Sequence, residues 1–277
     1  MPPAKKRTRT YDPAKIRTAV LAQFAHVREA VAGLTEEQLA APTRLGDWTV
    51  RELAAHVAMV VGAVARVLEM AEPAKHELPL LEWPSGTATK SAAIAERTRE
   101  LAASAESAEL FARTTARIEK ALAEAPGTRL VPTLPQALDR AGAGEPQTGA
   151  MTLADFLVTR IVELVVHTDD LNDALPGLDV PYDRQALAAC TRVLADTLAV
   201  KAPGASTEVR IPPFAVVQCV EGPRHTRGTP PNVVETDPLT WIRLATGRVE
   251  WRAVLDDAKV SASGERADLS RLLPLMG

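Results

Sequence analysis

The segment RIVELVVH, residues 160–167, decides the fold of the first half of the chain. At about 100° per residue its apolar residues cover nearly the whole circumference of a helix, and Glu163 and His167 lie one turn apart on one face. A helix that is apolar nearly all round is buried, so its polar stripe must find partners in the interior. We therefore expect this helix, from Thr152 to about Gly177, in the core of a helical bundle.

Three further long helices are predicted before this segment. Asp12 followed by Pro13 is a typical helix start, and the spacing of Thr49 and Glu52 is that of a capping box. The three helices are expected over about residues 13–33, 50–67 and 91–125. Pro-rich residues 71–90 and Pro/Gly-rich residues 126–150 are predicted loops, and the length of the second indicates a functional loop. Four long helices predict a four-helix bundle.

The pattern changes after Pro181. Asp183 is the predicted cap of a helix to about Val200, and a later helix begins at Asp237 and stops at Gly247. Short β-rich runs are expected at residues 208–211, 215–220 and 232–236, and residues 249–255 and 258–262 read equally as strands or helix pieces. The predicted fold class is α plus α+β. Its parts are a disordered basic tail at 1–14, a four-helix bundle at 15–178 and a smaller α+β domain at 180–277.

Composition limits the partners of this chain of 277 residues. A net charge of -3 gives no overall field that would recruit nucleic acid or an anionic membrane. The sequence contains no apolar run long enough to span a membrane and no apolar segment after Met1 typical of a signal peptide. We therefore expect a cytoplasmic protein with Cys190 and Cys219 reduced, and the sequence leaves a homodimer open.

His56 is the third residue of a candidate metal site. In the helix predicted over residues 50–67 it falls at the margin of the inward face, where it could meet Glu163 and His167. Two imidazoles and one carboxylate leave zinc a fourth position for water or substrate, which is typical of catalytic zinc sites. Bundle cores hold metals with carboxylates and imidazoles from facing helices.

Two neighbours on the same helix face are candidates for supporting the metal ligands without binding the metal themselves. Asp170, near one turn past His167, could orient a ligand, and Arg160 shares the polar stripe. The residue pattern leaves a structural alternative open. In that alternative Glu163 and His167 make a hydrogen bond within one helix, and His56 is a core histidine with satisfied hydrogen bonds.

The run Arg224-His225-Thr226-Arg227-Gly228 lies between predicted strands. Arg224, His225 and Arg227 could bind a carboxylate or phosphate through charge-assisted hydrogen bonds. A solvated loop is the alternative reading of the same run.

Two motifs carry a resemblance to a known family. Residues 46–56, GDWTVRELAAH, and residues 159–171, TRIVELVVHTDDL, resemble the mycothiol-dependent maleylpyruvate isomerase family over roughly residues 15–175. The resemblance implies a DinB-like four-helix bundle in which His56, Glu163 and His167 bind a divalent metal, zinc above all. It also implies mycothiol or another low-molecular-weight thiol as cofactor.

The second half is similar to a different family. Residues 209–219, 221–238 and 262–269 resemble the bacterial branch of sterol carrier proteins, a type of domain fused to such bundles in actinobacterial proteins. It differs from the shorter C-terminal domain of the isomerases, so the resemblance leaves the substrate open. Thr246-Gly247-Arg248 resembles a motif of that shorter domain, which implies a substrate-binding role for Arg248.

Two functions follow as hypotheses. The first is an enzyme, an isomerase or a thiol S-transferase, that activates a thiol at the metal site and acts on a small molecule. The alternative is a non-catalytic carrier whose C-terminal domain binds a small apolar or lipid-like ligand.

Overall fold

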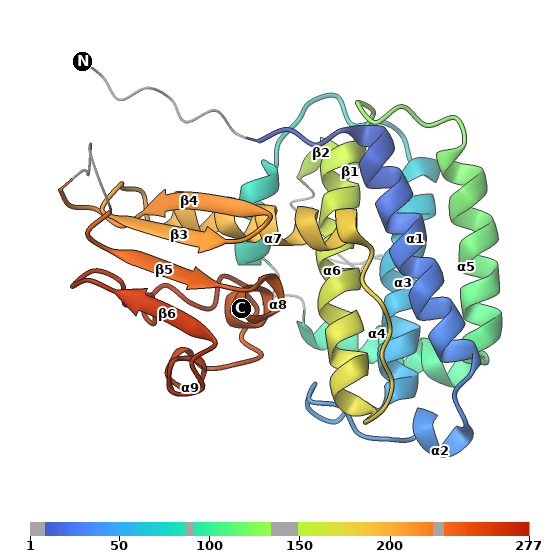
Figure 1. Cartoon of the computed structure of the whole chain (residues 1–277). Coiled ribbons are helices and arrows are strands. Elements are labelled where there is room, and N and C mark those ends of the chain that lie inside the picture. Colours follow the sequence, from blue (N-terminus) through green and yellow to red (C-terminus); the bar gives the residue numbers. More distant parts are fainter. Residues whose placement is uncertain (1–8, 87–90, 134–148, 224–229, 277) are drawn as a thin grey trace. The chain divides into compact units, whose positions relative to one another are not determined.

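Two compact units make up the chain in a computed structural model (Figure 1), which describes residues 9–86, 91–133, 149–223 and 230–276. Residues 13–190 form the first, the helical unit. Residues 191–275 form the second, the sheet unit, together with residues 9–12. The predicted basic tail falls mostly on residues 1–8, which lie outside the described residues. The predicted fold class, a helical bundle followed by a smaller α+β part, is confirmed.

The helical unit is built from packed long helices. Helices α1 and α3 both pack on α5 and on α6, and α3 also packs on α4 (Figure 1). Its elements are α1 (Pro13–Ala32), α2 (Glu36–Leu39), α3 (Val50–Glu69), the 3-10 helix η1 (Leu80–Gly86), α4 (Ser91–Ser104), α5 (Ser107–Leu122), β1 (Leu130–Pro132), β2 (Ala150–Thr152) and α6 (Leu153–Ala174).

Helix α6 is the buried core helix that its sequence predicts. Nearly every side chain from Leu153 to Leu171 is buried, and the apolar ones contribute much of the core of this unit. Burying apolar side chains is the dominant favourable contribution to folding. The capping box at the start of α3 is also present, with the Thr49 amide donating to Glu52 Oε2 at 2.8 Å.

The prediction of one long helix over residues 91–125 is wrong, because the chain forms two helices there, α4 and α5. The break falls at a pair of serines that flank Ala105 and Glu106. The Ser104 hydroxyl donates to the Leu101 carbonyl at 2.9 Å. Serine side chains compete for backbone groups in this way, which makes them weak residues in a helix interior.

The two predicted loops contain regular structure at their ends. Residues 80–86 form η1, and strands β1 and β2 pair antiparallel with Leu130 opposite Thr152. Residues 134–148, between these strands, lie outside the described residues. Beyond β2 the Leu153 amide donates to the Arg129 carbonyl at 2.7 Å, so the strand pair continues directly into the first turn of α6.

The sheet unit has a four-stranded sheet in the order β4-β3-β5-β6. Strand β3 is antiparallel to β4 and parallel to β5, and β5 is antiparallel to β6. Its elements are β3 (Thr207–Ile211), β4 (Ala215–Cys219), β5 (Val233–Thr236), α8 (Pro238–Ala245), α9 (Trp251–Asp256) and β6 (Val260–Ser263), while α7 (Arg184–Lys201) crosses from one unit to the other. Of the two ambiguous predicted runs, 249–255 therefore lies mostly in a helix and 258–262 mostly in a strand.

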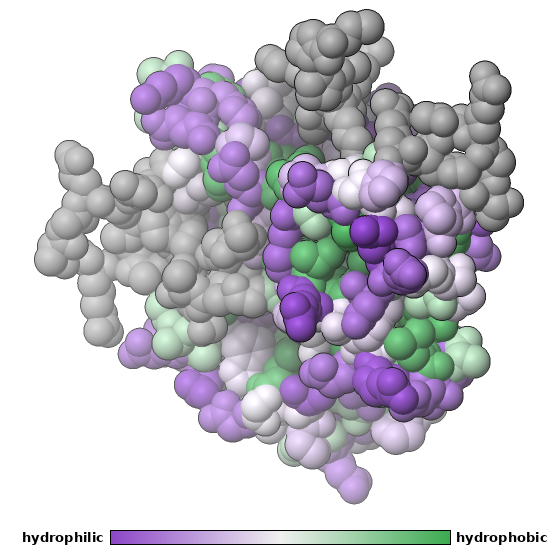
Figure 2. All heavy atoms as spheres, turned by 90° about the vertical axis from the view of Figure 1, so that its left-hand side faces the viewer, coloured by the Kyte–Doolittle hydropathy of each residue, from purple (hydrophilic) through white to green (hydrophobic). Residues whose placement is uncertain are grey.

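The cysteines and the surface agree with the composition. Cys190 and Cys219 are buried free thiols, and burial raises the pKa of Cys190. None of the described helices is both long and apolar enough to cross a bilayer. Where described residues form the face in Figure 2, it is mostly hydrophilic, with hydrophobic side chains in small groups. Scattered apolar side chains of this kind are ordinary on globular proteins.

Gly204 provides a test of the sheet unit. A Cβ on Gly204 would overlap the backbone carbonyl of Val220, which cannot move as a flexible side chain could. We expect Gly204→Ala to lower the free energy of unfolding by about 1–3 kcal/mol, measured by urea denaturation. Gly33→Ala is the matched control, because its Cβ would meet only the Ala30 carbonyl at 3.6 Å. Equal stability of the two variants would contradict the described packing at Gly204.

Candidate metal centre

Three side chains from two helices converge inside the helical unit. His56 comes from α3, and Glu163 and His167 come from adjacent turns of α6. Each offers one ligand atom, and these atoms all lie within 4.8 Å of one another. Both histidines are buried, and the Glu163 side chain is 17% exposed. Among the described residues, they are the group of His, Cys, Asp and Glu side chains that could hold a metal ion.

The spacing of these atoms fits a tetrahedral metal site. Glu163 Oε2 lies 3.6 Å from His56 Nε2 and 3.3 Å from His167 Nε2. Tetrahedral zinc with bonds of about 2.0–2.1 Å places neighbouring ligand atoms roughly 3.3–3.4 Å apart. Both contacts are longer than the usual N–H···O hydrogen bond of about 2.9–3.0 Å. The two distances from Glu163 Oε2 are therefore close to those between ligands of one ion, and the three ligand atoms all lie within 4.8 Å of one another.

Asp170 orients the imidazole of His167. Its Oδ2 lies 2.8 Å from His167 Nδ1, and its side chain is completely buried. A proton held on Nδ1 by this carboxylate leaves Nε2, the atom facing Glu163, to act as the metal ligand. Asp170 therefore lies beside His167, where it could hold the imidazole in place.

Arg44 binds the two buried aspartates, a role that the sequence analysis did not predict. It lies before α3, and its Nε donates to Asp170 Oδ1 at 2.7 Å while its Nη2 donates to Asp169 Oδ2 at 2.6 Å. Tyr182 also donates its hydroxyl proton to Asp169 Oδ1 at 3.2 Å. The only available signal was indirect: two adjacent aspartates in a buried helix require a cation, but no spacing shows which one.

The polar contacts of His56, to Thr98 and Glu163, are longer than those of His167, to Asp170 and Glu163. The Nδ1 of His56 lies 3.5 Å from the Thr98 hydroxyl of α4, and the Trp48 ring packs at 5.1 Å between centroids. The ring of His167 meets that of His56 edge-on, with centroids 4.7 Å apart. His56 is therefore positioned mainly by ring packing.

Burial and neighbouring groups shift the pKa values of the three side chains in different directions. Burial lowers the pKa of His56, which favours the neutral imidazole that metals bind. Burial opposes ionisation of Glu163, but hydrogen bonding to His167 and His56 outweighs it, so the pKa of Glu163 is well below its usual value. For His167 burial is likewise outweighed, here by Asp170 and Glu163, and its pKa is raised.

The other predicted site residues do not join this group. Arg160 lies one turn before Glu163 on α6, but its Nε donates to the Thr159 hydroxyl. Arg248 belongs to the sheet unit, where its Nη1 donates to the Thr246 carbonyl at 2.9 Å. The loop residues Arg224, His225 and Arg227 lie outside the described residues.

Comparison with known proteins identifies both halves of the chain. Residues 20–172 match the family described as the mycothiol maleylpyruvate isomerase N-terminal domain, and residues 183–275 match the bacterial SCP ortholog family. Comparison with curated proteins finds no match.

Two solved structures are similar in fold. A crystal structure of the mycothiol-dependent maleylpyruvate isomerase is 15% identical, covers 93% of this chain and 95% of its own, and gives a TM-score of 0.59. A histidine-to-alanine mutant of a mycothiol-dependent maleylpyruvate isomerase is 16% identical, with the same coverage and a TM-score of 0.57. At such low identity these structures support the fold alone.

The contacts around His167 generate a prediction about metal affinity. Asp170→Asn and Arg44→Gln should each weaken zinc binding by about 10–100-fold, since outer contacts of a ligating histidine have effects of that size. Competition with a chromophoric chelator would measure the zinc affinity of each variant. Arg51→Gln is the control, because Arg51 pairs with Glu36 outside the centre. Unchanged affinity in both variants would mean that the Arg44–Asp170 contact does not support the centre.

Proposed function

The chain belongs to the family of the mycothiol maleylpyruvate isomerase N-terminal domain, and on that basis we propose that it is a metal-dependent enzyme that uses a low-molecular-weight thiol, mycothiol or a similar one. The observation that carries the proposal is the convergence of His56, Glu163 and His167 at the spacing of tetrahedral ligands.

Two imidazole nitrogens and one carboxylate oxygen form a donor set that suits zinc and leaves a position for an exogenous ligand. A bound divalent metal would supply Lewis acidity that lowers the pKa of a thiol, as metals do for water. The protein contributes the fixed ligand positions. Asp170 keeps the proton of His167 on Nδ1, and the buried surroundings limit access of water to the centre.

The proposed substrate is a small molecule with an electrophilic carbon. In one outcome the thiolate adds to a cis double bond beside a carbonyl, the resulting single bond rotates, and elimination of the thiol gives the trans isomer. In the other outcome the thiol replaces a leaving group and stays on the product. The same centre serves both reactions, so the proposal covers an isomerase and a thiol transferase.

Metal analysis tests the proposal directly. The wild-type protein should hold stoichiometric zinc, whereas His56→Ala, Glu163→Gln and His167→Ala should each lose most of it, because each removes one of only three protein ligands. His76→Ala is the control, since His76 is exposed and outside the centre. Elemental analysis after dialysis measures the result. Full metal content in all three ligand variants would contradict the site.

A second measurement addresses the thiol. In the cobalt-substituted protein, addition of a thiol such as mycothiol should produce a sulfur-to-cobalt charge-transfer band, because a thiolate would occupy the open position. Metal binding without any thiol-dependent change in the spectrum would leave the metal site intact but refute the use of a thiol cofactor.

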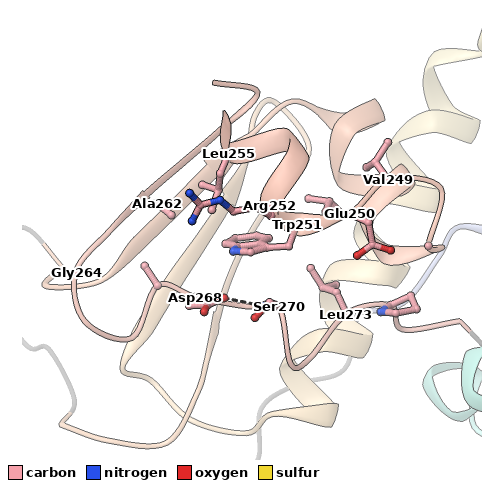
Figure 3. Close-up of a pocket in the computed structure, with 14 residues that line it drawn as sticks. Val249, Glu250, Trp251, Arg252, Leu255, Ala262, Gly264, Asp268, Ser270 and Leu273 are labelled. Atoms are coloured by element: carbon pink, nitrogen blue, oxygen red, sulfur yellow. Dashed lines mark hydrogen bonds between the residues drawn. The ribbon is translucent and has the colours of Figure 1, made fainter. Parts of the chain in front are cut away.

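A cavity in the sheet unit favours the carrier alternative. It has a volume of about 480 Å³ and is lined by residues from α8 and α9, the end of β6 and the segment that follows. Figure 3 places the Trp251 ring at the centre of the drawn side chains, with Leu255 on one side and Leu273 on another. The lining also includes the polar or charged side chains of Glu250, Arg252, Asp268 and Ser270. Small-molecule sites combine apolar walls with placed polar groups of this kind. In this alternative, the cavity carries a small apolar or lipid-like ligand.

The carrier alternative has its own test. A fluorescent fatty-acid probe should bind the full-length protein, and Leu273→Asp should abolish binding, since it puts a charge in the apolar wall. Val216→Asp is the control, because Val216 is 57% exposed on β4 and does not line the cavity. Absence of probe binding to the wild type, or equal binding by both variants, would exclude this cavity as the carrier site.

A further inference from the structure

Arg160 is a buried cation beside the candidate metal centre. It is only 4% exposed and lies on α6 one helical turn before Glu163. The planar guanidinium lies near two aromatic rings, with its Cζ 4.8 Å from the centre of Phe156 and 5.9 Å from that of Trp83. Such cation–π contacts offset part of the cost of removing a guanidinium from water.

No acidic side chain in the described part of the chain pairs with this guanidinium. Its Nε donates to the Thr159 hydroxyl at 3.1 Å, and Glu163 acts on it only through space. Arg66 adds a second positive charge nearby, and together with burial it lowers the pKa of Arg160. Arginine nevertheless stays protonated in proteins. The helix therefore carries a desolvated positive charge that lacks a carboxylate.

The contrast with the other end of the polar stripe is informative. Asp169 and Asp170, also buried on α6, receive two short hydrogen bonds from Arg44. An unpaired buried ion is among the most destabilising features that a protein can contain, so it is retained where a ligand completes it. At the Arg160 end the charge of Glu163 acts only through space, so the guanidinium can still form an ion pair with an added anion.

The geometry also indicates the kind of anion. With Nε bound to Thr159 and the plane fixed by Phe156 and Trp83, the two Nη groups remain as a fork of N–H donors. Such a fork matches the two oxygens of a carboxylate, whereas a point charge such as lysine cannot make the paired contact.

We propose that Arg160 is the carboxylate anchor of the site, binding the anionic group of a small organic acid whose reactive carbon lies at the His56–Glu163–His167 centre. Residues one turn apart on a helix are neighbours, so an acid of a few carbons spans the two positions. The identity of the reacting centre rests on the proposed function, whereas binding of the carboxylate does not.

The experiment compares succinate with its uncharged analogue succinamide on the full-length protein, by ligand-detected NMR. Metal-free samples exclude direct binding to the metal. The wild type should prefer succinate, and Arg160→Met should lose that preference, with succinate affinity falling roughly tenfold or more. Arg160→Lys should retain part of it. Arg113→Met is the matched control, because Arg113 is an exposed arginine of the same unit paired with Glu109.

Thermal unfolding of the same variants separates anchoring from a structural role. Replacing an unpaired buried cation by an apolar side chain should leave the midpoint unchanged or raise it. If Arg160→Met fails to fold, Arg160→Lys tests the proposal instead, because its succinate affinity should fall in part. Equal binding of succinate and succinamide by the wild type, or unchanged succinate affinity in the variants, would overturn the proposal. Failure to bind metal would refute the proposed function without affecting this result.

Discussion

The need to satisfy the polar stripe of a buried helix organises the helical unit. Helix α6 is apolar around most of its surface, and its interior position contributes to the core of the bundle. The same burial makes every charged group on it costly unless a partner is near. His56 on α3 and Arg44 before it supply these partners. Polar contacts as well as apolar packing therefore hold these segments against α6.

The polar groups of α6 form two regions of opposite character. Toward its C-terminal end, Asp169 and Asp170 are neutralised by Arg44 within the protein. Toward its N-terminal end, Arg160 has aromatic packing in place of an ion pair. The metal centre lies between them. On one side of the centre the charges are thus paired within the protein, whereas on the other side Arg160 has no ion pair among the described residues.

The sequence was informative where periodicity carries the signal. Helix phase placed Glu163 and His167 on one face, because i, i+4 spacing determines which residues share a face, and it placed His56 at the margin of an inward face. The family resemblance then implied that the three share one metal site, and they do converge. The contact between Arg44 and Asp170 could not be predicted from spacing. Arg44 lies in a non-periodic segment, 126 positions from Asp170, and no local pattern connects the two residues. Trp83 was missed because its 3-10 helix looks like a Pro-rich loop.

Strand β2 ends at Thr152, and the same residue caps α6 through its hydroxyl. Because Pro132 lies opposite Ala150, the chain leaves this strand pair and returns to it at neighbouring points. Residues inserted into or deleted from the intervening stretch would therefore not rotate α6 or displace the residues that it carries. That stretch can therefore vary in length and composition while the geometry of Glu163 and His167 stays constant.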